Sequence, residues 1–166
     1  MRATLALLIM SLSVGCQYIV PVKPTAENPT TLGLPFGLTY QRTMHALAAQ
    51  KPGVKRSDTA ELLITTDKAT VRLNETQADC GTYSGKPYLK DSRTVTTVAY
   101  SVRLRDDGDA THITVNTEIA GRFQGTATHE ATTELSCVSR GTLERDLITK
   151  IREAPPPDFK SGPFRK

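Results

Sequence analysis

One segment of this chain has hydrophobic side chains at the spacing of an α-helix. Between residues 39 and 50 the apolar positions are Tyr40, Met44, Leu47 and Ala48, and His45 lies just beside them. Positions four, seven and eight residues apart share one face of an α-helix, so the pattern predicts a helix of about three turns. The sequence Lys51-Pro52-Gly53 ends this helix, because proline cannot donate the next backbone hydrogen bond.

The pattern then changes to an alternation with a period of two. Five segments carry it, with inward positions Ala60, Leu62 and Ile64; Ala69, Val71 and Leu73; Val98, Tyr100, Val102 and Leu104; Ile113, Val115, Thr117 and Ile119; and Ala131, Thr133, Leu135 and Cys137. This alternation predicts five strands, each with one buried and one wet face. The many threonines of these segments suit a wet face, since a β-branched hydroxyl residue fits the pleat and stays solvated.

Two turns are predicted between these strands. The first is at Asp67-Lys68, where it would join the first two strands into a hairpin. The second is at residues 106–109, which read Asp-Asp-Gly-Asp, because Gly108 is free to take the positive φ that a tight hairpin needs.

A second helix is predicted over residues 142–154. Its apolar positions are Leu143, Leu147, Ile148 and Ile151, and three prolines follow from Pro155. Thr142 or Ser139 is expected to cap its start, and Glu144 is expected on its wet face.

The order of these elements predicts an α+β fold. We expect two layers, with an antiparallel sheet of about five strands covered on one face by two helices in the order α-β-β-β-β-β-α. Residues 39–154 would form this single domain, residues 16–38 a proline-rich tether, and residues 155–166 a disordered tail that carries Phe159 and Phe164.

The first fifteen residues have the layout of a secretory signal peptide. Arg2 supplies a positive charge, an uncharged apolar run follows, and small residues stand before Cys16. Two alternatives use the same residues. One is a membrane-spanning helix over residues 3–20, against which Gln17 and Pro21 count, and the other is simple secretion after cleavage before Cys16.

The residues Leu12-Ser13-Val14-Gly15-Cys16 resemble the lipobox of bacterial lipoproteins. Ser13 stands where that family most often has leucine. The resemblance implies that the Cys16 thiol carries diacylglycerol, that the chain is cut before Cys16, and that the new amine is acylated. Such acyl chains suffice for stable anchoring in a membrane.

The resemblance also implies a location. In the enterobacterial members of the family, aspartate after the cysteine retains the protein in the inner membrane, whereas this chain has Gln17. We therefore expect the outer membrane and its periplasmic face, with the inner membrane and the cell surface as alternatives. The order of helices and strands is also similar to that of small domains in outer-membrane assembly lipoproteins.

The cysteines support an oxidising compartment. The chain has three, and if Cys16 is lipidated, Cys80 and Cys137 are left as an even pair. We therefore expect a disulfide between Cys80 and Cys137.

No pattern of catalytic or metal-binding residues stands out. His45, His112 and His129, with Glu130 adjacent, lack the spacing of a metal site, and acidic pairs such as Glu130 with Glu134 or Asp106 with Asp107 occur in any charged chain. The net charge of +4 is spread along the sequence without a basic cluster, so nucleic acid is not an expected partner. We expect no cofactor and no metal.

These observations favour a non-catalytic module bound to the membrane through Cys16. Such a module would bind an envelope protein through a sheet edge or a helix groove. The alternatives are a cell-wall-acting enzyme, which a cluster of His112, His129 and acidic groups in a pocket would favour, and a surface-displayed interaction protein.

Overall fold

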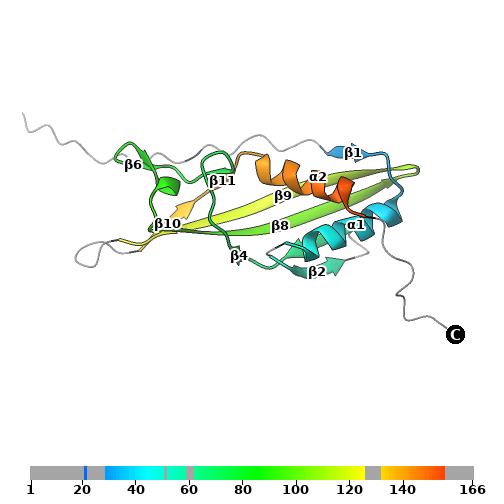
Figure 1. Ribbon diagram of the computed structural model, residues 1–166, viewed down its shortest axis with the longest axis horizontal. Helices are drawn as coiled ribbons and strands as arrows, with labels where there is room; N and C mark the ends of the chain where they lie inside the picture. Colours follow the sequence, from blue (N-terminus) through cyan, green and yellow to red (C-terminus); the bar gives the residue numbers. More distant parts are fainter. Residues whose placement is uncertain (1–20, 22–28, 51, 59–61, 126–131, 156–166) are drawn as a thin grey trace, which may run out of the picture.

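A long antiparallel hairpin forms the centre of the molecule (Figure 1). Its strands are β8 (Thr94–Asp107) and β9 (Ala110–Phe123), each of 14 residues. They pair over their whole length, and the turn between Asp107 and Ala110 holds Gly108 at a φ of 72°. The computed structural model describes residues 21, 29–50, 52–58, 62–125 and 132–155, and all statements below concern these residues.

Five shorter strands complete a seven-stranded antiparallel sheet within the described ranges. Strands β3 (Leu63–Thr66) and β4 (Ala69–Thr70) both pair with β8, and β2 (Val54–Asp58) pairs with β3. On the other side of the hairpin, β1 (Thr30–Leu32) and β10 (Thr133–Ser136) pair with opposite ends of β9.

Two small ladders and a short helical turn lie outside this sheet. Strand β5 (Ala78–Asp79) pairs with β11 (Val138–Ser139), and β6 (Thr82–Tyr83) pairs with β7 (Lys86–Pro87). A 3₁₀ turn, η1 (Tyr88–Lys90), leads into β8.

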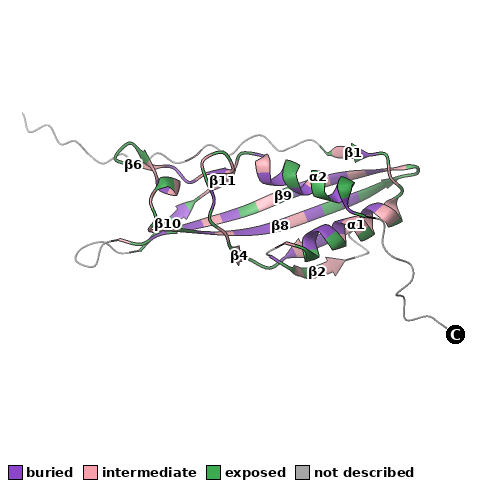
Figure 2. Cartoon of the chain, in the orientation of Figure 1, coloured by how far each residue is buried: buried purple, intermediate pink, exposed green. Residues whose placement is uncertain are grey.

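The two helices, α1 (Phe36–Ala48) and α2 (Thr142–Glu153), pack against the same face of the hairpin and against each other. The buried positions on that face are Val98, Tyr100, Val102, Leu104, Ile113, Val115 and Ile119. Exposed or half-buried residues separate most of them along the two long strands, as Figure 2 shows, but Ala99 in β8 is also buried. The expected α+β class, with an antiparallel sheet and two helices, is therefore confirmed.

The sheet has more strands than the five expected, and the element order begins with a strand. Residues 30–32 and 36–38, assigned to the tether, belong to β1 and to the start of α1. Leu32 is buried, and Pro35 immediately precedes α1, where its missing N–H costs nothing. The tether prediction is therefore wrong for these residues, while residues 16–20 and 22–28 lie outside the described residues.

The predicted hairpin turn at Asp67-Lys68 is also wrong. Strands β3 and β4 both pair antiparallel with β8, one after the other, so the chain does not reverse direction between them. The Thr66 hydroxyl accepts a hydrogen bond of 2.8 Å from the Tyr100 N–H, which fills the break between the two strands. The strand that forms a hairpin with β3 is β2, and β2 was not predicted from the alternation of apolar and polar residues.

The buried face of α1 is rotated from the predicted one. Thr39, Thr43, Ala46 and Leu47 are buried, whereas Ala48 is exposed. Thr43 can be buried because its hydroxyl donates to the Thr39 carbonyl at 2.7 Å, so no polar group is left without a partner. On α2, Leu143, Leu147 and Ile151 are buried as expected, but Glu144 is buried with them.

Candidate binding pocket

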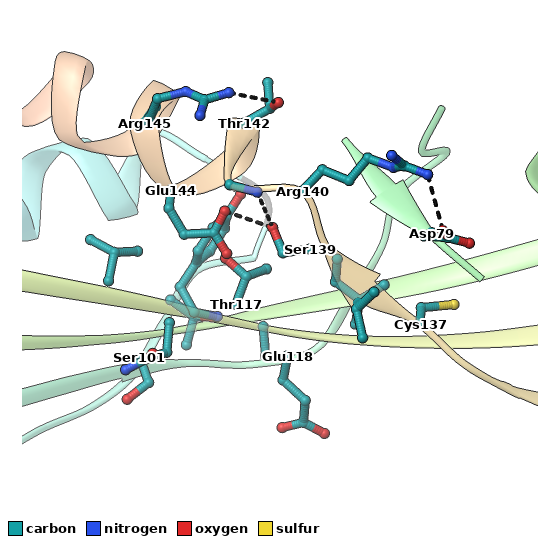
Figure 3. Close-up of a pocket in the computed structure, with 18 of the residues that line it drawn as sticks. Asp79, Ser101, Thr117, Glu118, Cys137, Ser139, Arg140, Thr142, Glu144 and Arg145 are labelled. Carbon is teal, nitrogen blue, oxygen red and sulfur yellow. Dashed lines mark hydrogen bonds and ion pairs between the residues drawn. The ribbon is translucent and has the colours of Figure 1, made fainter. Parts of the chain in front are cut away.

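A pocket of about 990 Å³ lies between the start of α2 and the sheet (Figure 3). Its floor comes from β3, β8 and β9, and the connection from β11 to α2 covers it. Thr76 and Asp79 add a wall from the segment that leads to Cys80. This volume is at the upper end of the range of sites that hold small molecules or side chains of a partner.

The connection above the pocket is fixed by hydrogen bonds. Gly141 takes the N-cap position of α2 with a φ of 79°, a conformation that glycine adopts without steric cost. The Ser139 hydroxyl accepts the Gly141 N–H at 3.1 Å and donates to Glu144 Oε2 at 2.6 Å. Ser139 therefore supports the helix start from two residues before the cap, and the expectation that Ser139 or Thr142 is the cap residue itself is wrong.

Two further contacts hold this connection to the neighbouring segment. The Thr142 hydroxyl donates to the Thr76 carbonyl at 2.8 Å. The Arg140 guanidinium pairs with the Asp79 carboxylate at 3.0 Å, and Figure 3 shows this pair beside the pocket. These contacts fix the roof and the wall relative to each other.

Glu144 brings a carboxylate into the interior. Only 4% of this residue is exposed, and Figure 3 shows its side chain reaching from α2 toward the sheet. Below it, Tyr100 is buried in β8. Burial raises the Tyr100 pKa above its usual value, and the negative charges of Glu144 and Asp146 raise it further.

Polar and apolar side chains both line the floor of the pocket, and the apolar ones include two on the buried face of β9. Val115 and Ile119 are buried residues of β9 that line it, and Thr117 lies between them on the same face. The Oγ1 atom of Thr117 is buried and has no hydrogen-bond partner within the described chain. A hydroxyl in this state can bind a group that enters the pocket.

The predicted disulfide between Cys80 and Cys137 is present, with an S–S distance of 2.03 Å. Cys137 also lines the pocket. The bridge joins the segment after β5 to the segment after β10, which are 57 residues apart. It therefore fixes one end of the pocket wall to the main sheet.

The two histidines within the described residues, His45 and His112, have separate surroundings. His112 lies between the Thr31 hydroxyl at 2.8 Å and the Asp107 carboxylate at 3.0 Å, near the closed end of the hairpin. His45 is exposed on α1, and His129 and Glu130 lie outside the described residues. The described residues contain no group of three or more potential metal ligands.

The remaining acidic candidates have structural roles. Glu134 pairs with Arg122 across β10 and β9, and Asp106 accepts the Gly108 N–H in the hairpin turn. Cys16, Phe159 and Phe164 lie outside the described residues.

Sequence patterns missed Glu144 and Tyr100 as site residues. Tyr100 was predicted only as an inward position of the sheet. One signal could have found Glu144, because glutamate three residues after an N-cap often folds back over the helix start.

No family model matches the chain, and a search of curated proteins found no match. None of the helices in the described ranges is long and apolar enough to cross a membrane.

Proposed function

We propose that this protein is a lipid-anchored envelope lipoprotein whose folded domain is a non-catalytic binding module. The observation that carries the binding role is the pocket of about 990 Å³, which combines buried apolar side chains in its floor with a buried carboxylate and a hydroxyl that has no partner within the described chain. Sites that hold ligands in proteins combine these same features.

The anchor is supported by the N-terminal sequence. Leu12 to Cys16 resemble a lipobox, and a lipid on Cys16 explains why the other two cysteines form an even pair. The disulfide between Cys80 and Cys137 suits an oxidising compartment such as the periplasm. Gln17 favours the outer membrane, with the domain on its periplasmic face and an envelope protein as the expected partner.

Site-directed photo-crosslinking in living cells tests the binding role. A photoreactive amino acid is placed at Thr76, which is exposed and belongs to the pocket wall, in the chain with Cys16 intact. Glu153, exposed at the other end of α2, is the matched control position. Because position 76 lies in the pocket wall and position 153 does not line the pocket, we expect a defined adduct in the envelope fraction from position 76 alone.

Mass spectrometry of the irradiated envelope reads the result. The binding role is contradicted when position 76 yields no adduct, or when positions 76 and 153 yield the same set of adducts.

A further inference from the structure

We propose that the pocket selects a positively charged amine on an apolar stem and that Glu144 recognises the charge. This inference rests on the proposed binding function and names the chemistry of what binds. The amine would be the side chain of a lysine in a partner protein or the amine of a small envelope molecule.

The first argument is the small number of partners around the Glu144 carboxylate. An ionised carboxylate has two oxygens that can accept about four hydrogen bonds. Within the described chain one donor reaches it, the Ser139 hydroxyl at 2.6 Å. The carboxylate therefore keeps acceptor capacity for a donor from outside the chain.

The second argument is the absence of a cation beside this carboxylate in the described part of the molecule. The two arginines nearest in sequence are engaged elsewhere, Arg140 with Asp79 and Arg145 with the Thr142 hydroxyl at 3.2 Å. A charged side chain on a residue that is only 4% exposed is costly unless a partner compensates for the charge. A cation that enters the pocket would supply this compensation.

The third argument is the surroundings of the carboxylate. An ammonium group has three N–H donors. Glu144 offers one acceptor from above, and the unpartnered Thr117 Oγ1 offers another from the floor, as Figure 3 shows for the two side chains. The aliphatic side chains of Val115 and Ile119 can contact the stem that carries the ammonium.

A simpler role for Glu144 must be separated from this one. With Ser139, Glu144 also supports the start of α2, and a glutamine would keep that hydrogen bond while it removes the charge. Glu144→Gln is therefore the informative variant, and Glu153→Gln, on the exposed face of the same helix, is its control.

The experiment uses residues 17–166, which hold every described element, and titrates them with three six-carbon probes. Hexylammonium, hexanol and hexanoate share the stem and differ in charge. We expect hexylammonium to shift the amide NMR signals of pocket residues saturably and to bind at least about tenfold more tightly than hexanol, since hydrogen bonds to a charged group are strong. Hexanoate should bind most weakly.

Glu144→Gln should lower the affinity for hexylammonium by about tenfold and leave that for hexanol unchanged, whereas Glu153→Gln should change neither. Thr117→Val, which removes the unpartnered hydroxyl, should weaken hexylammonium binding alone. Thermal unfolding curves establish that the variants are folded. In the unmodified protein, bound hexylammonium should also lower the Tyr100 pKa, because its positive charge offsets that of Glu144.

The inference is overturned when hexanol binds as tightly as hexylammonium, when hexanoate binds best, or when Glu144→Gln leaves hexylammonium affinity unchanged. Any of these results alongside an adduct at position 76 contradicts amine selection and leaves the binding role in place. An amine-selective pocket without any adduct in cells contradicts the binding role instead.

The adduct also identifies the source of the amine. A lysine-containing peptide in its digest indicates a partner protein, whereas a single small mass indicates a free envelope amine. An adduct with no amine contradicts the inference.

Discussion

Gly121 is a residue whose missing side chain the fold requires. It lies in β9 between Thr96 of β8 and Leu135 of β10. A Cβ atom at this position would come within 2.9 Å of Cys137 Sγ and 3.1 Å of Leu135 Cβ. The disulfide and the β10 backbone can therefore approach β9 closely only because no side chain stands there.

Gly121→Ala should destabilise the protein by about 1–3 kcal/mol, since the disulfide and β10 must move to admit the methyl group. Gly33→Ala is the control, because a Cβ there meets nothing within 4 Å. Urea unfolding gives both free energies. Equal urea midpoints for the two variants would show that the disulfide can move away from the methyl group without a loss of stability.

Glu144→Ala should destabilise the protein by about 1–2 kcal/mol, because it leaves the Ser139 hydroxyl and the start of α2 without their partner. Glu153→Ala, an exposed change on the same helix, should cost less than about 0.5 kcal/mol. The helical pattern placed Glu144 on the wet face, and that placement is wrong. Urea midpoints that agree for the two variants would mean that burial of Glu144 contributes nothing to stability.

At the scale of elements, α2 supplies much of the cover for the sheet. Leu147 is 1% exposed and lies in the core cluster between the helices and the hairpin. Leu147→Ala should leave a cavity and cost about 2–5 kcal/mol, whereas Lys150→Ala on the exposed face should cost little. The chain used for the urea melts must start before Thr30. A start at Leu38, next to the domain boundary predicted from the sequence, would remove β1 and the beginning of α1. A Leu147→Ala midpoint equal to that of Lys150→Ala would contradict this packing.

The elements that sequence patterns predicted well are those in which local pattern and tertiary packing agree. Strand β8 has a large apolar side chain at every second residue from Val98 to Leu104, and Gly108 marks its turn. Strand β2 reads Val-Lys-Arg-Ser-Asp and has no apolar alternation, because it lies at the sheet edge with half-buried and exposed residues. Nothing in its sequence signals a strand.

The Asp67-Lys68 turn shows a different limit. Two polar residues between alternating segments are typical of a hairpin, but the Thr66 hydroxyl bonds to the Tyr100 N–H and keeps the chain on β8. Buried threonines in α1 mislead in the same way, since each can satisfy its hydroxyl within the helix. A side chain that bonds to a distant or preceding backbone group leaves no periodic signal.

At the scale of the whole molecule, the pocket could not be predicted from sequence. Its lining comes from β3, β8, β9, the segment before Cys80, and the connection into α2. These parts are far apart in the chain, and only the pairing of the strands and the disulfide brings them together. The disulfide was predictable because the prediction used the number of cysteines and an oxidising compartment and did not need the geometry of the fold.

Lipidation is the whole-molecule property on which the proposed function depends. Cys16→Ser should leave an unlipidated and uncleaved precursor, because the thiol that receives diacylglycerol is lost. Metabolic labelling with an alkyne fatty acid should mark the unmodified protein and not the variant. Equal labelling of both would exclude the anchor at Cys16.

The uninterrupted pairing of β8 with β9 has a consequence for the order of folding. These strands are adjacent in sequence and closed by a two-residue turn, so their contacts cost little loop-closure entropy, whereas β1 and β10 can pair only after β9 exists. We expect the hairpin to be formed in the transition state for folding. Val102→Ala should then slow refolding, whereas Leu135→Ala should mainly speed unfolding, and stopped-flow measurements give both rates. The opposite pattern would show that β10 forms before the hairpin. Cys137 follows β10 directly. If the hairpin forms first, the oxidation of Cys80 and Cys137 to their disulfide should be fastest once β10 has paired with β9.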